Sequence, residues 1–164
     1  MKTLTLLRHA KSSWKDASLI DHDRPLNERG KRDLPVMAER IHQVGIRPSL
    51  ILSSTAVRAW TTAKGIANEI SYPVEFLQRE QRLYHAGVQR IIEVLAEQDL
   101  GFNSIFLVGH NPGFTDFANY LLPGVTDNIP TCGLVSVMLD SDDWNLKKKK
   151  NAELAVYDYP KKQP

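Results

Sequence analysis

The N-terminal segment of the chain reads Thr3-Leu4-Thr5-Leu6-Leu7-Arg8-His9-Ala10-Lys11. Residues 3–8 form a short apolar run broken by threonines, which is typical of a buried β-strand. The run ends at an arginine and a histidine, so the first strand delivers two polar side chains to one edge of the predicted sheet. Later strands of the chain end in a similar way, and this shared ending is the basis of the functional prediction below.

Strands and helices alternate along the chain. Apolar runs predict further strands at residues 49–52, 73–77, 104–108, 134–139 and 153–157. Helical spacing of apolar residues predicts helices at residues 27–44, 55–70, 87–98 and 112–122. Asn27 is placed to cap the first helix, and either Ser54 or Thr55 to cap the second. We therefore predict an α/β fold, with three α/β/α layers around a central, mostly parallel sheet of about six strands, in a single domain over residues 1–164.

Three segments place basic or imidazole side chains at the same predicted edge of this sheet. Arg8 and His9 follow the first strand, Arg58 lies one helical turn after the second, and His110 follows the fourth. Ligands of open α/β sheets bind beyond the carboxyl ends of the strands. Helix starts at this edge also present backbone N–H groups that favour anions. The sequence thus predicts an oxyanion pocket formed by two arginines and two histidines.

The residue types suggest phosphoryl transfer. Arginine offers a planar fork of donors that matches a phosphate and keeps its charge. A neutral imidazole can form a covalent intermediate, so transfer of a phosphoryl group to His9 would divide one difficult hydrolysis into two easier steps. Arg8, Arg58 and His110 would stabilise the charge on the equatorial oxygens. Because the arginines supply the positive charge, we expect no metal ion and no other cofactor.

Four segments resemble the histidine phosphatase superfamily, also described as phosphoglycerate mutase-like. They begin at Leu7-Arg8-His9-Ala10, Leu26-Asn27-Glu28-Arg29-Gly30, Ser53-Ser54 (with Arg58) and Gly109-His110-Asn111-Pro112. The variant with Ala10-Lys11-Ser12 is most similar to the small SixA-type phosphohistidine phosphatases. The resemblance implies a histidine-phosphatase-like fold, with His9 as the phospho-acceptor and Arg8, Arg58 and His110 holding the phosphoryl group.

The resemblance also shows one departure. Many members of the superfamily carry an acidic residue after the third strand that protonates the leaving group, and here Gln81 stands at that place with Glu80 beside it. An alcohol leaving group needs a proton donor, whereas an imidazole leaves readily. The missing acid therefore favours phosphohistidine in a protein as the substrate. The short segment around residues 84–87 leaves the pocket open, which suits a phosphorylated side chain on a protein surface.

Two other functions remain open. With Glu80 as the acid, the chain would be a phosphomonoesterase that acts on a small phosphorylated metabolite. Without turnover, it would be a phosphate-binding interaction module. Ser12 and His85 are further candidates for the pocket, Trp14 lines the substrate entrance or covers the core edge, and Asp21 is interpreted as loop structure.

Composition narrows the class of protein. Residues 145–164 contain six lysines and two acidic residues, whereas residues 1–144 carry 15 basic and 17 acidic side chains. This acidic body does not predict a nucleic-acid partner, and Lys147 to Lys150 are expected at a solvated hairpin tip. Cys132 is the only cysteine, and no apolar run reaches the roughly 18 residues of a membrane span. We expect a cytoplasmic protein, monomeric or weakly dimeric, without membrane contact, whose partner is a phosphorylated protein.

Overall fold

The computed structural model describes residues 1–162, which contain a six-stranded sheet in the order β3-β2-β4-β1-β5-β6. The strands are β1 (Lys2–Arg8), β2 (Leu50–Ser53), β3 (Gln78–Arg79), β4 (Ser104–Gly109), β5 (Leu134–Leu139) and β6 (Ala152–Asp158). The first four pair in parallel, and β5 runs antiparallel to both of its neighbours. The predicted mostly parallel sheet is confirmed.

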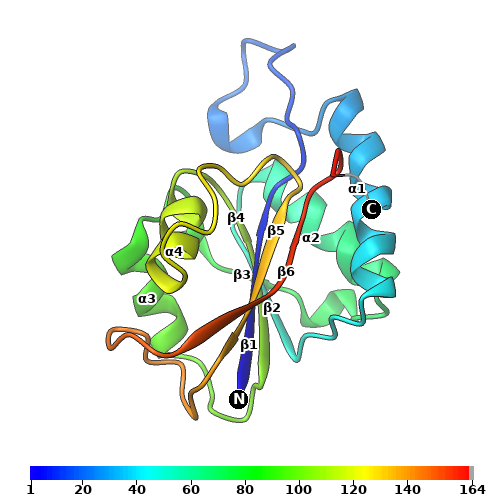
Figure 1. The fold of residues 1–164 in the computed structure, drawn as a ribbon. Helices are drawn as coiled ribbons and strands as arrows, with labels where there is room; N and C mark the ends of the chain where they lie inside the picture. The colour runs from blue at the N-terminus through cyan, green and yellow to red at the C-terminus, as the bar shows by residue number, and fades with distance from the viewer. Residues whose placement is uncertain (163–164) are drawn as a thin grey trace.

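Helices cover both faces of the sheet and give the predicted three layers (Figure 1). The helices are α1 (Glu28–Gln43), α2 (Val57–Glu69), α3 (Val88–Ala96) and α4 (Gly113–Leu121). In β1, Leu4 and Leu6 belong to the hydrophobic cluster under α3 and α4, whereas Leu7 belongs to the cluster under α1 and α2. Successive strand side chains point to opposite faces, so a strand covered on both sides buries apolar side chains on each face, as Leu4, Leu6 and Leu7 of β1 do.

The first helix begins and ends where the sequence predicts. The side chain of Asn27 accepts a hydrogen bond from the backbone N–H of Gly30 at 2.8 Å, which satisfies one of the free donors at the start of α1. At the other end Gly45 has a φ of +79°, a conformation that glycine adopts without strain. The helix continues through Pro35.

Two local predictions are wrong. The third strand was expected at residues 73–77, but the chain forms a 3₁₀ turn at Val74–Phe76, and β3 comprises only Gln78 and Arg79. Pro73 cannot donate a ladder hydrogen bond, and the N–H groups of Phe76 and Leu77 bond back to residues 73 and 74. The second helix has Ala56 rather than Ser54 or Thr55 at its N-cap.

Strands β5 and β6 form the predicted hairpin, with Lys147–Lys150 in its connection. The lysines are exposed or half-exposed, but Trp144 and Leu146 just before them are buried. The indole N–H of Trp144 donates to the carbonyl of Phe102 at 2.8 Å. None of the helices within residues 1–162 has the length and apolar character that crossing a membrane requires.

Candidate active site

Arg8, His9, Arg58 and His110 line one cavity of about 300 Å³. They come from the ends of β1 and β4 and from the first turn of α2, so the cavity lies at the carboxyl edge of the parallel strands. The loop after β1 rises above this edge, at the top of Figure 1. The structure thus brings together the four side chains that the sequence places at three separate strand ends.

His9 is fixed between the neighbours of β1. Its backbone N–H donates to the carbonyl of Gly109 at 3.0 Å, and its own carbonyl accepts from the N–H of Cys132 at 2.9 Å. The ring Nδ1 lies 2.7 Å from the carbonyl oxygen of Ala10. A carbonyl can only accept, so Nδ1 carries the proton and Nε2 keeps a free lone pair. This tautomer is the one that a nucleophilic Nε2 requires.

The surroundings of His9 keep its ring neutral. Burial, together with the nearby charges of Arg58, Arg8 and Arg24, lowers the pKa of His9 to about 4, against the opposing effect of the hydrogen bond to Ala10. A protonated imidazole has no lone pair with which to attack phosphorus. At neutral pH the ring of His9 is therefore neutral, and its Nε2 lone pair is available.

Acid should destabilise the fold through His9. Between pH 6.5 and about 4 the unfolded chain binds a proton at His9 that the folded pocket excludes. The free energy of unfolding should thus fall as the pH drops through this window, by on the order of 3 kcal/mol from His9 alone. Urea unfolding at a series of pH values measures the fall. The His9→Gln variant is the control, and an equally steep fall in that variant would contradict the assignment.

His110 completes the imidazole pair. The ring centres of His9 and His110 lie 5.2 Å apart. Nε2 of His110 is 2.7 Å from the hydroxyl oxygen of Ser54, and that oxygen also accepts from the N–H of Ala56 at 3.2 Å. The Ser54 hydroxyl proton can then be donated to Nε2, which leaves the proton of the His110 ring on Nδ1. Burial, followed by the charges of His9 and Arg58, lowers the pKa of His110, so its ring is neutral too.

Three buried donors of these side chains are unpartnered. Within residues 1–162, the buried side-chain atoms without a hydrogen-bond partner include Arg8 Nε, Arg58 Nε and His110 Nδ1. Buried polar groups are nearly always paired in proteins, so a cluster of free ones requires an explanation. All three residues line the cavity that contains His9. The arrangement suits an oxyanion that accepts from all three.

Asp21 is the site residue that the sequence reasoning missed. Its carboxylate lies 3.0 Å from Arg58, 3.1 Å from Arg24 and 3.3 Å from His85, and it accepts from the hydroxyl of Tyr84 at 2.6 Å. Burial raises the pKa of Asp21, but the hydrogen bonds from Tyr84, Arg58 and Arg24 and the charge of Arg58 hold it well below its usual value. Asp21 is thus an ionised carboxylate that contacts several site residues and orients the guanidinium of Arg58. The interpretation of Asp21 as loop structure alone is incomplete.

Of the remaining residues that the sequence suggests for the site, Ser12 and His85 lie at the cavity and Glu80 does not. Ser12 and His85 line the cavity together with Trp14, and His85 stands at the rim with half of its side chain exposed. Glu80 does not line the cavity. Its carboxylate pairs with Arg82 at 2.7 Å, and hydrogen bonds from Arg82 hold its pKa below the usual value. The structure therefore turns Glu80 away from the reacting centre and keeps it ionised.

A close backbone contact supports the rim of the site. A methyl group added at Gly113, the first residue of α4, would collide with the backbone carbonyl of Ala86, next to His85. We expect Gly113→Ala to lower the free energy of unfolding by about 1–3 kcal/mol, because the carbonyl cannot move without its loop. Denaturant unfolding measures this. Gly87→Ala is the matched control, since nothing lies within 4 Å of its added methyl group, and equal losses would contradict the explanation.

No group of three or more histidine, cysteine, aspartate or glutamate side chains arranged to hold a metal ion occurs within residues 1–162. The only cysteine, Cys132, is buried beside His9, and burial raises the pKa of its thiol to about 12. The basic side chains that line the cavity are Arg8, Lys11, Arg24 and Arg58.

Comparison with known proteins places the chain in a family. The family model of the histidine phosphatase superfamily (branch 1) matches residues 4–81. An uncharacterized chloroplastic protein of Arabidopsis thaliana is 31% identical over 156 residues, which cover 87% of this chain and 69% of that protein. An uncharacterized protein of Mycobacterium tuberculosis is 32% identical over 106 residues, 65% of this chain and 63% of that protein. The chain belongs to the histidine phosphatase superfamily, and we class it as a phosphatase.

Within the superfamily the chain is of the SixA type. A SixA protein of Agrobacterium tumefaciens, provisionally named a phosphohistidine phosphatase, has a TM-score of 0.83 and 26% identity, covering 97% of this chain and 98% of that one. The protein histidine phosphatase SixA in complex with tungstate has a TM-score of 0.79 and 22% identity, with 96% and 97% covered. A mycobacterial glucosyl-3-phosphoglycerate phosphatase shares the fold at a TM-score of 0.69 and 17% identity, with 96% and 98% covered.

Proposed function

We propose that this protein hydrolyses phosphohistidine in a phosphorylated protein, through a phosphoryl intermediate on His9 and without a metal ion. The observation that carries the proposal is the cluster of three buried, unpartnered donors on Arg8, Arg58 and His110 around a neutral His9. Such donors stabilise the charge that develops on the equatorial phosphoryl oxygens. The likeness to the SixA proteins supports the same substrate class.

In the first step Nε2 of His9 attacks phosphorus. The new bond joins Nε2 to phosphorus, and the bond between phosphorus and the substrate imidazole breaks. The electron pair of that bond leaves with the imidazole, which takes up a proton to become neutral. Arg8, Arg58 and His110 hold the three transferring oxygens during this exchange.

In the second step water hydrolyses the intermediate. A bond forms between the water oxygen and phosphorus, the Nε2–phosphorus bond breaks, and His9 regains its lone pair. One proton of the water goes to solvent or to the group that gave its proton to the departing imidazole in the first step. The hydrogen bond from Nδ1 to Ala10, at 2.7 Å, keeps the ring in place throughout.

The proton for a leaving group would come from His85 rather than from Glu80. His85 stands at the cavity rim, where its Nε2 lies 3.3 Å from the Asp21 carboxylate. Its ring centre is 5.5 Å from that of His110. Glu80, by contrast, is bound to Arg82 outside the cavity.

A release assay tests the proposal. Phosphohistidine, phosphoserine, an aryl phosphate and a sugar phosphate are offered at equal concentration, and phosphate release is measured for each. We expect the highest kcat/KM for phosphohistidine in a protein. A higher kcat/KM for the sugar phosphate would instead favour the small-metabolite phosphomonoesterase. Tight phosphate binding without any release would favour the interaction module.

Variants at the two candidate acids give a sharper prediction. Glu80→Gln should leave kcat nearly unchanged for both an aryl and an alkyl phosphate. His85→Gln should lower kcat for the alkyl phosphate by about 10²-fold, the lower end of general acid catalysis, and much less for the aryl phosphate. Steady-state kinetics on the two esters measures the difference. A selective loss in Glu80→Gln would restore Glu80 as the proton donor.

A further inference from the structure

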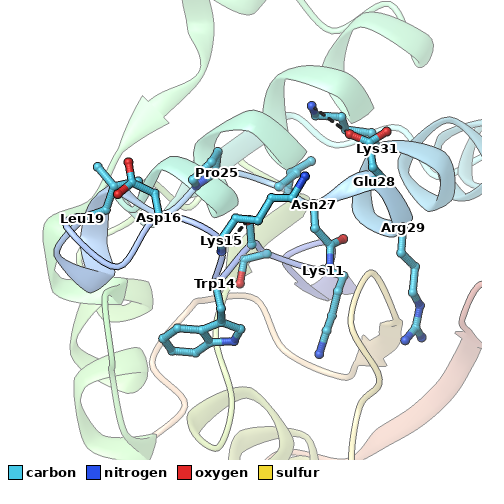
Figure 2. A pocket seen from close by; sticks show the side chains of 13 residues that line it. Lys11, Trp14, Lys15, Asp16, Leu19, Pro25, Asn27, Glu28, Arg29 and Lys31 are labelled. Atoms are coloured by element: carbon cyan, nitrogen blue, oxygen red, sulfur yellow. Dashed lines mark hydrogen bonds and ion pairs between the residues drawn. The ribbon is translucent and has the colours of Figure 1, made fainter.

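A second and larger cavity adjoins the phosphoryl pocket. Its volume is about 620 Å³, and it lies between the loop after β1 and the first turn of α1 (Figure 2). The two cavities share Lys11, Ser12 and Trp14 as lining residues. A molecule in the larger cavity, which we call the loop cleft, would therefore touch the entrance of the pocket that holds His9.

The loop cleft carries an excess of positive charge. Lys11, Lys15, Arg29 and Lys31 line it, against the acidic Asp16 and Glu28. Asp16 already accepts two hydrogen bonds from Ser18, and Glu28 pairs with Lys31 at 3.6 Å. Lys11 and Lys15 form no ion pair within residues 1–162. Both are free to bind an anionic ligand.

Trp14 supplies an apolar surface between these charges. Its side chain is 74% exposed, and Figure 2 shows it beside Lys11 and Lys15. The guanidinium carbon of Arg24 lies 3.5 Å from the centre of its ring, a cation–π contact that holds the indole. An exposed tryptophan that is fixed in this way can bind a partner at a low cost in conformational entropy.

The loop itself is anchored. The N–H of Ser13 donates to Pro25 at 2.8 Å, and the N–H of Asn27 donates to Lys11 at 3.0 Å. Gly30 packs so closely on the Lys11 carbonyl that a methyl group would collide with it. These contacts join the two ends of the loop to each other and to the first turn of α1. The cleft is thus a preformed surface whose shape does not depend on a ligand.

We propose that the loop cleft binds an acidic segment of the protein that carries the phosphohistidine. The inference rests on the proposed function, because it places the phosphorylated side chain in the His9 pocket and its acidic neighbours against Lys11 and Lys15. Residues 1–144 carry more acidic than basic side chains. An extended polyanion such as a nucleic acid would meet repulsion beyond the cleft, whereas a short acidic peptide would not.

The test compares histidine peptides phosphorylated chemically, with acidic or with neutral residues around the phosphohistidine. We expect the acidic peptide to have the higher kcat/KM. Lys15→Glu combined with Lys31→Glu should lower kcat/KM for the acidic peptide by about tenfold, mainly through KM and less at high salt. The same variant should leave turnover of an aryl phosphate unchanged. Lys64→Glu is the matched control, since Lys64 is exposed on α2 and away from both cavities.

Several outcomes would overturn the inference. The first is an equal kcat/KM for the acidic and the neutral peptide. The others are a loss of kcat/KM in the double variant that is as large for the neutral peptide, and an equal loss in Lys64→Glu. Binding of the unphosphorylated acidic peptide tests the cleft independently of turnover. It is monitored by tryptophan fluorescence, and the Trp14→Phe variant shows which part of the signal comes from Trp14. If this peptide binds and phosphohistidine is not hydrolysed, the proposed function is wrong, but the loop cleft is still a binding site for an acidic peptide. If a single-stranded oligonucleotide binds more tightly than the acidic peptide, the ligand of the loop cleft is a nucleic acid and the inference is wrong.

Discussion

Replacement of His9 by alanine is expected to abolish turnover, lowering kcat by on the order of 10⁶-fold, the size of loss seen when a covalent nucleophile is removed elsewhere. The reason lies in the geometry of Nε2. With Nδ1 bonded to the Ala10 carbonyl, Nε2 is the free nitrogen of a neutral ring in a cavity of arginine donors. His110, whose Nε2 is engaged with Ser54, offers no equivalent nucleophile.

Pulse labelling measures the intermediate directly. The protein is exposed briefly to labelled phosphohistidine substrate and quenched in alkali, which preserves a phosphorus–nitrogen bond. Wild-type protein should retain label that acid removes, and His9→Ala should retain none. His42→Ala is the control, because His42 is an exposed residue of α1 outside the cavity. Label that persists in His9→Ala would place the intermediate on another side chain.

Replacement of Arg58 by alanine is expected to lower kcat/KM by about 10³–10⁵-fold, the range for an arginine that stabilises phosphoryl transfer. Two effects contribute. The variant loses a buried, unpartnered donor of a residue that lines the cavity, and it leaves the Asp21 carboxylate, now 3.0 Å from Arg58, with Arg24 as its remaining arginine partner. A carboxylate that is less fully neutralised would repel a phosphoryl group.

A second substitution separates these two effects. Adding Asp21→Asn to Arg58→Ala removes the repulsion and should restore part of the activity, whereas Asp21→Asn alone should lower kcat/KM because Arg58 loses its orientation. Arg58→Lys keeps the charge without the planar fork and should recover little. Steady-state kinetics on an aryl phosphate measures all four variants. An Arg58→Ala variant with nearly wild-type kcat/KM would exclude Arg58 from the site.

The four central residues of the cavity were predictable because the sheet topology dictates where they meet. Arg8 is the last residue of β1, and His9 and His110 directly follow β1 and β4. Arg58 lies in the first turn of the helix after β2. The carboxyl ends of parallel strands converge at one edge. Apolar runs in the sequence located those strands, so the residues after them could be assembled without coordinates.

Asp21 could not be found in this way. It begins a three-residue 3₁₀ turn within the loop between β1 and α1, where the sequence has no periodic pattern. Its role depends on contacts with Arg58 and Tyr84, which are distant in sequence. A signal was present in retrospect, since the acidic Asp21 precedes Arg24 by one turn. Such a pair by itself is typical of ordinary loops.

The misplaced third strand has a different cause. Val74, Phe76 and Leu77 have the composition of a strand, but 62% of the Phe76 side chain is exposed and the segment lies at the edge of the sheet. There β2 offers only two pairing positions, Leu52 with Gln78 and Ser53 with Arg79. Strand composition is a weak predictor where few neighbours are available to pair.

The placement of Cys132 bears on how this chemistry responds to oxidative stress. Peroxides react with thiolates, and phosphatases whose nucleophile is a cysteine are switched off when that sulfur is oxidised. Here the sole thiol is buried in its protonated form, and the attacking atom of the proposed mechanism is a ring nitrogen of His9. Under that mechanism, dephosphorylation would continue under oxidation that inactivates thiol-dependent phosphatases.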